Sequence, residues 1–280
     1  MKKSSVHKLT CGLIFGFMHL SHLCRVSSLQ WFFQVFWIGA CAIAMLFTTA
    51  FLIGGDMLPP VWLTGYVFCA TTFAYNYAAS GWRRLLAWMM CACAVGFFLK
   101  INIDQQRATL APALLWLLYY DYHGIGTGFR QHPAAKPVAI ALAWAIATVW
   151  IPILPECRPG LGLLFIGRAA FVFALALAYD LCDQEYDLHR GLTTLVLRSG
   201  PRNSRRLCDA ALLLAAGCAL GNVLRGVFDW PQALALSATL CTAAWAIRYI
   251  PAQVQWGPWR KVAIDGLMIL QTTLVWLATR

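Results

Sequence analysis

The chain has 280 residues, of which 60% are hydrophobic and only 12% are charged, and its formal net charge is +11. A soluble domain carries about twice that charged fraction, so the composition excludes an ordinary water-soluble protein. The positive charges lie in short segments between apolar runs and not on a basic domain, which also excludes a nucleic-acid-binding protein. The sequence therefore predicts an all-α, polytopic membrane protein.

The first 28 residues combine a basic start with a short apolar core, as a secretory signal peptide does. Because no small-residue cleavage site follows, we interpret residues 9–24 as an amphipathic interfacial segment that leads into the first span. A cleaved signal peptide is the alternative. We expect residues 1–280 to form a single transmembrane domain, with residues 1–28 as its N-terminal interfacial segment.

Apolar periodicity, interrupted by glycine and proline pairs, predicts nine membrane spans. Each can cross a hydrocarbon core about 30 Å thick if the tilts of the helices vary. The predicted spans are 29–53, 59–79, 85–99, 108–120, 137–154, 161–180, 207–224, 231–249 and 262–279.

The distribution of lysine and arginine predicts the orientation of these spans. With the N-terminus in the cytoplasm, 16 of the 22 basic residues lie on the cytoplasmic side, in agreement with the positive-inside rule. The six on the outer side are Lys100, Arg107, Arg158, Arg168, Arg225 and Arg280. We therefore expect a multi-pass protein of the bacterial inner membrane, with polar cytoplasmic loops at 80–84, 121–136 and 181–206.

Four of the eleven acidic residues lie within eight positions, at Asp180, Asp183, Glu185 and Asp187. On a helix, the spacing of the three aspartates places them on one face. Carboxylates next to hydrocarbon are costly and usually functional, and three aligned carboxylates can hold one or two divalent cations such as Mg²⁺. The alternative is an ordinary juxtamembrane loop whose acids pair with the arginines that follow. These are Arg190, Arg198, Arg202, Arg205 and Arg206.

The run D-L-C-D-Q-E-Y-D-L-H-R-G-L-T-T-L, residues 180–195, closely resembles the second aspartate-rich motif of the UbiA-type membrane prenyltransferases. The resemblance implies a bundle of about nine transmembrane helices around a lateral chamber, with motifs on cytoplasmic loops after the second and sixth spans. Residues 128–136 are similar to the basic loop between the fourth and fifth helices. Asp265-Gly266 with Leu270-Gln271 are similar to the last helix of a divergent bacterial branch.

The first motif of that family, an asparagine followed by three aspartates, is degenerate in this chain. Asn76 is present, but the aspartate positions hold Tyr77, Ser80 and Arg84, and residues 57–99 contain no carboxylate. A metal cradle built from two acidic clusters therefore cannot form in the usual way. Either one cluster suffices, with Arg83 and Arg84 neutralising a diphosphate, or the site has lost catalysis.

The resemblance implies transfer of an isoprenoid chain from a polyprenyl diphosphate to a small or lipid acceptor at the cytoplasmic face. It implies Asp180, Asp183 and Asp187 as catalytic residues and Mg²⁺ ligands. The residues expected to bind the diphosphate are Asn76, Arg83, Arg84, Arg130 and Lys136. The alternative is a catalytically degenerate protein of this fold that binds or moves a lipid or quinone without turnover.

Overall fold

The computed structural model of the chain describes residues 27–54, 58–78, 81–119, 132–154, 161–189, 191–253, 257 and 259–280. Within these ranges the chain is helical and contains no strand. The main helices are α2 (Ser27–Ile53), α3 (Val61–Asn76), α4 (Trp82–Phe98), α5 (Ile103–Tyr119), α6 (Ala135–Ala145), η2 (Ile146–Trp150), α7 (Ile151–Ile153), α8 (Leu161–Cys182), α9 (Gln184–His189), α10 (Leu195–Leu224), α11 (Trp230–Tyr249), η3 (Ile250–Ala252) and α12 (Trp259–Ala278). The interfacial segment 9–24, Arg130 and Arg190 lie outside the described residues.

The prediction of an all-α, polytopic membrane protein is confirmed. In the described part of the chain, six helical segments are long and apolar enough to cross a membrane. They are Val35–Ile53, Ala135–Ile153, Leu161–Cys182, Leu195–Leu224, Trp230–Ala252 and Trp259–Ala278. Helices α3, α4 and α5 occupy the positions of the second to fourth predicted spans but have only 16, 17 and 17 residues.

Two predicted boundaries are wrong. The fourth span begins at Ile103 and not at residue 108, and helical structure before the seventh span begins at Leu195 and not at residue 207. The predicted breaker Gly200 does interrupt the helix, because its backbone is non-helical with φ 79° and ψ 156°. Pro201 then restarts a helix, since proline at the first helical position has no amide hydrogen bond to lose. With α9 also present, the expected polar loop 181–206 is largely helical.

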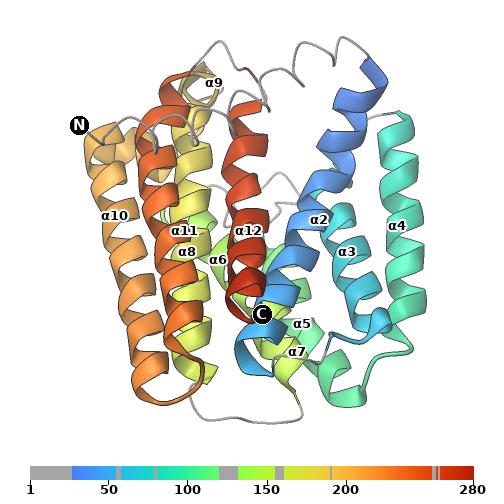
Figure 1. Ribbon diagram of the computed structural model, residues 1–280. Helices are drawn as coiled ribbons and strands as arrows, with labels where there is room; N and C mark the ends of the chain where they lie inside the picture. Colours follow the sequence, from blue (N-terminus) through green and yellow to red (C-terminus); the bar gives the residue numbers. More distant parts are fainter. Residues whose placement is uncertain are drawn as a thin grey trace.

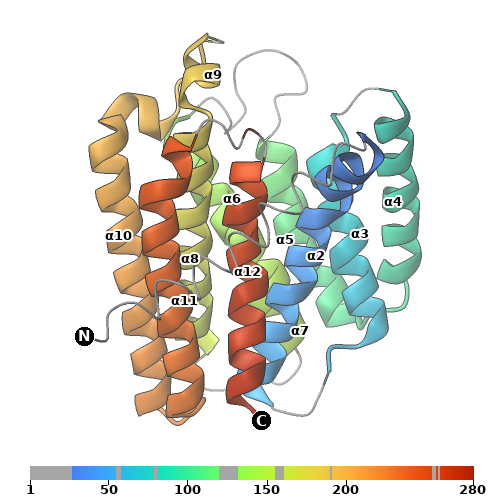
Figure 2. The ribbon, with the colours of Figure 1, turned by 45° about the horizontal axis from the view of Figure 1, so that its top comes forward.

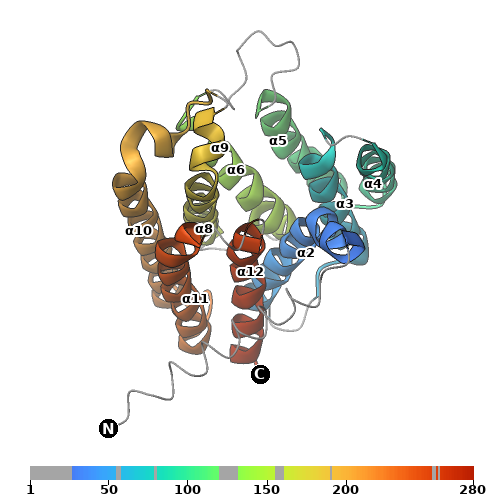
Figure 3. The same cartoon turned by 90° about the horizontal axis from the view of Figure 1, so that it is seen from above.

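Helix α8 packs mainly between α10 and α6 and also contacts α12. The helices form a continuous series in which α8 joins α6 to α10 (Figures 1, 2 and 3). In this series α5 packs on α6, α10 on α11, α11 on α12, α12 on α2, α2 on α3 and α3 on α4. The rings of Phe73 in α3 and Trp116 in α5, with centroids 5.5 Å apart, connect the two ends of the series.

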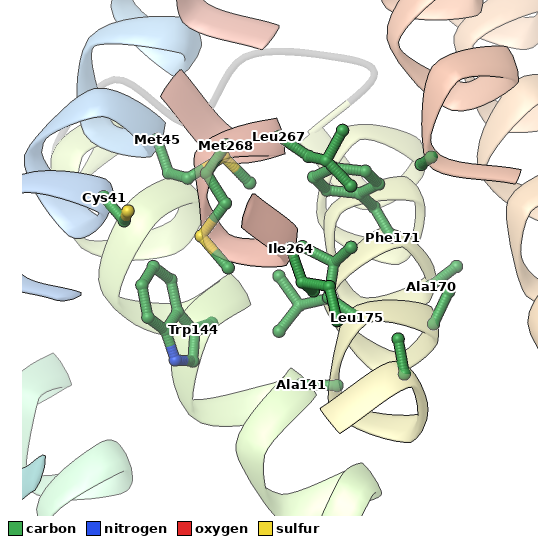
Figure 4. Close-up of a cluster of buried hydrophobic side chains, with 14 of the residues drawn as sticks. Cys41, Met45, Ala141, Trp144, Ala170, Phe171, Leu175, Ile264, Leu267 and Met268 are labelled. Atoms are coloured by element: carbon green, nitrogen blue, oxygen red, sulfur yellow. The ribbon is translucent and has the colours of Figure 1, made fainter. Parts of the chain in front are cut away.

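The core is built by α2, α3, α6, α8, α10, α11 and α12, and Figure 4 shows the part that α2, α6, α8 and α12 share. Met45, Phe171 and Ile264 are at most 1% exposed. Helices in lipid associate through close packing, because lipid tails are as apolar as the side chains. Gly65 provides such packing, since a Cβ added there would lie 2.7 Å from the ring of Phe97.

Four helices that carry charged or polar residues of interest have one end on the same side of the bundle, the side of α9 in Figure 1. Helices α3 and α8 finish there, whereas α6 and α12 begin there. The acidic residues at the end of α8 therefore lie beside the first turns of two other helices. This end of the bundle contains the candidate site.

Candidate functional site

Asp180, in the last turn of α8, is the most deeply buried carboxylate of the acidic motif at 1% exposure. Its Oδ1 accepts a charge-assisted hydrogen bond from Nζ of Lys136, in the first turn of α6. Its Oδ2 is buried and has no hydrogen-bond partner among the described residues. One oxygen of Asp180 therefore joins α8 to α6, while the other remains available as an acceptor.

Asp183 lies between α8 and α9, where the helix is interrupted. The expected single helix carrying all three aspartates is therefore wrong. Helix-like backbone bonds nevertheless continue through the break, from Asp183 N to Tyr179 O at 3.1 Å and from Asp187 N to Asp183 O at 2.8 Å. The Asp183 carboxylate forms an ion pair of 2.7 Å with Nζ of Lys261, in the first turn of α12.

Asp187, on α9, is only 5% exposed, and its Oδ2 also lacks a hydrogen-bond partner in the described part of the chain. Burial is the largest cause that raises the pKa of this carboxyl above its ordinary value. The charges of Asp180 and Asp183 raise the pKa further, whereas Lys136 and Lys261 lower it. All five charged groups therefore lie within electrostatic reach of one another.

We call these five residues, Asp180, Asp183, Asp187, Lys136 and Lys261, the charged cluster. Three carboxylates against two ammonium groups leave one net negative charge. The expected alternative partners, Arg198, Arg202, Arg205 and Arg206, form no ion pair with these aspartates within the described ranges. In the same ranges, no group of three His, Cys, Asp or Glu side chains is arranged to hold a metal ion by itself.

A second buried pair lies directly against the charged cluster. The hydroxyl of Tyr179 donates to Oδ2 of Asp265, and the Lys261 ammonium lies 5.9 Å from the centroid of the Tyr179 ring. Sequence reasoning assigned no role to Lys261, Tyr179 or Asp265. The spacing of Lys261 and Asp265, one turn apart on α12, was the available signal, since it places both on one helix face.

Asn76 and Arg83 lie together at the junction of α3 and α4. Asn76 is 3% exposed, and its Nδ2 donates to Thr72 O at 2.9 Å and Val35 O at 3.3 Å. Its Oδ1 accepts a hydrogen bond of 3.4 Å from Arg83. Asn76 therefore holds α3 against α2 and orients Arg83, whereas Arg84 is exposed.

The residues expected to bind diphosphate thus form two groups. Lys136 belongs to the charged cluster, and Asn76 with Arg83 forms the other group; no hydrogen bond or ion pair between the described residues joins them. An indirect connection runs through α6, because Nε1 of Trp144 donates to the hydroxyl of Tyr75 at 3.1 Å. Tyr75 precedes Asn76, so this bond fixes α3 relative to the helix that carries Lys136.

An open apolar pocket of about 430 Å³ lies between α5, η2 and α8. Its walls include Ala108, Trp150, Gly162 and Ile166. Gly162 and Ile166 belong to the first turns of α8, so the pocket lies nearer the opposite end of the bundle from Asp180. Its lining suits a hydrocarbon chain.

Comparison with known proteins gives similarity in structure only. No family model matches the sequence, and no curated protein matches it. A digeranylgeranylglyceryl phosphate synthase in membranes has 12% identity and a TM-score of 0.59, with 90% of this chain and 96% of that chain covered. A UbiA homolog from Archaeoglobus fulgidus, bound to GPP and Mg²⁺, has 12% identity and a TM-score of 0.60, with 88% and 98% covered. The expected UbiA-like fold is therefore confirmed.

Proposed function

We propose that this integral membrane protein is a prenyltransferase that transfers an isoprenoid chain from a polyprenyl diphosphate to an acceptor at the cytoplasmic face. The shared fold supports the reaction class, because a protein of this fold was seen bound to GPP and Mg²⁺. The observation that carries the proposal is the pair of buried, unpartnered oxygens, Asp180 Oδ2 and Asp187 Oδ2, in one charged cluster. Buried acceptors normally have a partner, and a bound cation would supply one to these two oxygens.

The residues present fit a magnesium ion shared with a substrate. Mg²⁺ in proteins is usually held by one or two carboxylates together with substrate phosphates and water, and not by a complete protein cage. Asp180 and Asp187 would supply the two carboxylates, with Asp183 close by. When bound, Mg²⁺ supplies positive charge that stabilises a departing diphosphate.

Cationic side chains of this chain would bind the rest of the diphosphate. Lys136 and Lys261 lie among the aspartates. Arg83 lies at the α3–α4 junction, where its Nε is buried without a hydrogen-bond partner among the residues that the structure describes. The guanidinium fork suits phosphate oxygens. Residues 57–99 contain no carboxylate that could hold a second metal ion, so we propose that Arg83, with Arg84 and Arg130, neutralises the diphosphate in place of that ion.

The aromatic side chains beside the charged cluster suit the allylic carbocation that forms as the diphosphate leaves. The Tyr179 ring contacts Lys261 of the charged cluster, and Trp144 is hydrogen-bonded to Tyr75, the neighbour of Asn76; electron-rich ring faces attract cations. Asp265 is a buried carboxylate held by the Tyr179 hydroxyl. We propose that the apolar pocket of α5, η2 and α8 receives the isoprenoid tail.

The proposal is tested by incubating the purified protein with farnesyl or geranylgeranyl diphosphate, Mg²⁺ and candidate acceptors, and measuring diphosphate release. We expect release in wild type and its loss in Asp187→Asn. Glu185→Gln is the matched control, because Glu185 lies on α9, is exposed, and is outside the charged cluster. No release in wild type with any acceptor, or equal release in Asp187→Asn, would contradict the proposed enzyme.

The second candidate is a protein that binds or moves a lipid or quinone without turnover. The specific observation that favours it is that Lys136 and Lys261 already neutralise two of the three aspartates. This candidate predicts binding of the polyprenyl ligand without diphosphate release. Mg²⁺-independent binding of a polyprenyl alcohol, equal to that of the diphosphate, would distinguish it from the enzyme.

A further inference from the structure

Arg168 is a buried cation far from the charged cluster. It lies on α8, twelve residues before Asp180, which corresponds to about 18 Å along the helix axis. Arg168 was expected among the outer-side charges, but the structure buries it inside the bundle at 4% exposure. The proposed transferase chemistry does not use it.

The partners of Arg168 among the described residues are all neutral. Its guanidinium donates to Met45 O at 2.9 Å and Thr49 Oγ1 at 3.2 Å, with a longer contact of 3.5 Å to Thr148 Oγ1. Among the described residues no carboxylate pairs with it. Charged side chains within membrane spans pair with one another or with backbone carbonyls and commonly mark functional sites. The bond to Met45 O satisfies part of the guanidinium, but the positive charge of Arg168 has no counter-ion among the described residues.

Arg168 lines a small cavity of about 40 Å³ between α2, α8, α10, α11 and α12. One water needs roughly 10–15 Å³ on this measure, so the cavity has room for about three waters or one small ion with water. A diphosphate or a lipid headgroup is too large for it. Apart from Arg168, the polar side chains in its wall are Asn222 and Gln271.

Both residues are buried, and both amide oxygens are unsatisfied. Asn222 is 1% exposed and Gln271 is 4% exposed, and neither Asn222 Oδ1 nor Gln271 Oε1 has a hydrogen-bond partner within the described ranges. A half-turn of either amide exchanges its oxygen with its NH₂ group, which is a donor. The cavity therefore combines one cationic group with two amides whose hydrogen-bonding capacity the described chain leaves unused.

We propose that this Arg168 cavity binds a small monovalent inorganic anion such as chloride. Arg168 supplies the balancing charge, and the amides of Asn222 on α10 and Gln271 on α12 supply hydrogen-bond donors. The anion joins three helices at the end of the bundle opposite the charged cluster. This inference is independent of the proposed transferase activity, because no residue is shared.

The test is thermal unfolding of the purified full chain in detergent, with sodium chloride compared with sodium gluconate at constant ionic strength, which holds charge screening constant. We expect a saturable rise in the midpoint of about 5 °C when chloride reaches about 100 times its Kd. Arg168→Gln removes this rise. Arg225→Gln is the matched control, since Arg225 is an exposed cation at the same end of the bundle, and it retains the rise.

A second variant decides the matter if Arg168→Gln does not fold. Gln271→Leu keeps the cation and removes one amide. We therefore expect the chloride concentration that gives half of the rise in unfolding midpoint to be at least tenfold higher than in wild type. Crystals soaked in bromide should show an anomalous peak beside the Arg168 guanidinium. Equal wild-type unfolding midpoints in the two salts, or a bromide-soaked cavity that contains only water, would overturn the proposal.

Discussion

The pair of Lys136 and Asp180 should make an asymmetric contribution to stability. The Lys136 side chain is 24% exposed and that of Asp180 only 1%. Lys136→Met leaves a buried carboxylate without its cation, and breaking a buried pair in this way costs about 3–5 kcal/mol. Asp180→Asn leaves an ammonium that can extend to water, so we expect a cost of about 1–2 kcal/mol, near that of an unsatisfied polar group.

Thermal unfolding in detergent, without ligand or Mg²⁺, measures both variants. A loss of 1 kcal/mol lowers the midpoint by about 2–4 °C in a protein of this size class. Lys136→Met should therefore lower it by about 10 °C, and Asp180→Asn by about half as much or less. The double variant Lys136→Met with Asp180→Asn should recover most of the loss, because no charge remains buried.

The ion pair of Lys261 and Asp183 is the internal comparison. Its side chains are 39% and 31% exposed, so solvent screens the interaction and we expect less than about 1 kcal/mol from Lys261→Met. Equal losses for Lys136→Met and Lys261→Met, or strict additivity in the double variant of the buried pair, would refute this reasoning.

Three further predictions concern packing, chain length and metal dependence. Gly65→Val should lower the unfolding midpoint by an amount corresponding to about 1–3 kcal/mol, because a Cβ there meets the Phe97 ring; Gly96→Ala, with open space around it, should not. A Cβ at Gly162 meets no atom within 4 Å, so the side chain of Gly162→Trp should enter the apolar pocket that Gly162 lines, and product analysis should show a preference for shorter polyprenyl diphosphates; an unchanged preference would exclude the pocket as the tail site. Arg84→Asp restores one carboxylate missing from the first motif, and diphosphate-release assays should show a changed Mg²⁺ concentration dependence, not simple loss of activity.

Much of the fold could be predicted because it depends on local apolar runs. Nine such runs became nine helical segments within the described ranges, and most ends agree within about three residues. The larger errors occur where polar residues continue a helix, as in Asp104 to Arg107 at the start of α5 and after Pro201 in α10. Hydrophobic periodicity cannot detect a helical turn that extends beyond the apolar region.

The acidic residues of the site could be predicted, but their partners could not. Lys136 is 44 positions from Asp180, and Lys261 belongs to the last helix, so only the packing of α6 and α12 on α8 brings them together. The sequence offered five arginines much closer to the aspartates as alternative partners. Similarly, nothing local to Arg168 indicates that it points into the bundle and contacts the backbone of α2.

The most direct test of the proposed site measures Mg²⁺-dependent binding of a geranylgeranyl diphosphate analogue whose diphosphate group cannot leave. In wild type and Glu185→Gln, the analogue with Mg²⁺ should raise the unfolding midpoint by about 5 °C at about 100 times its Kd, and a chelator should remove most of the rise. Asp187→Asn should show no Mg²⁺-dependent rise. A rise of equal size in Asp187→Asn, or in wild type with the chelator, would contradict the assignment of these carboxylates to a magnesium–diphosphate site.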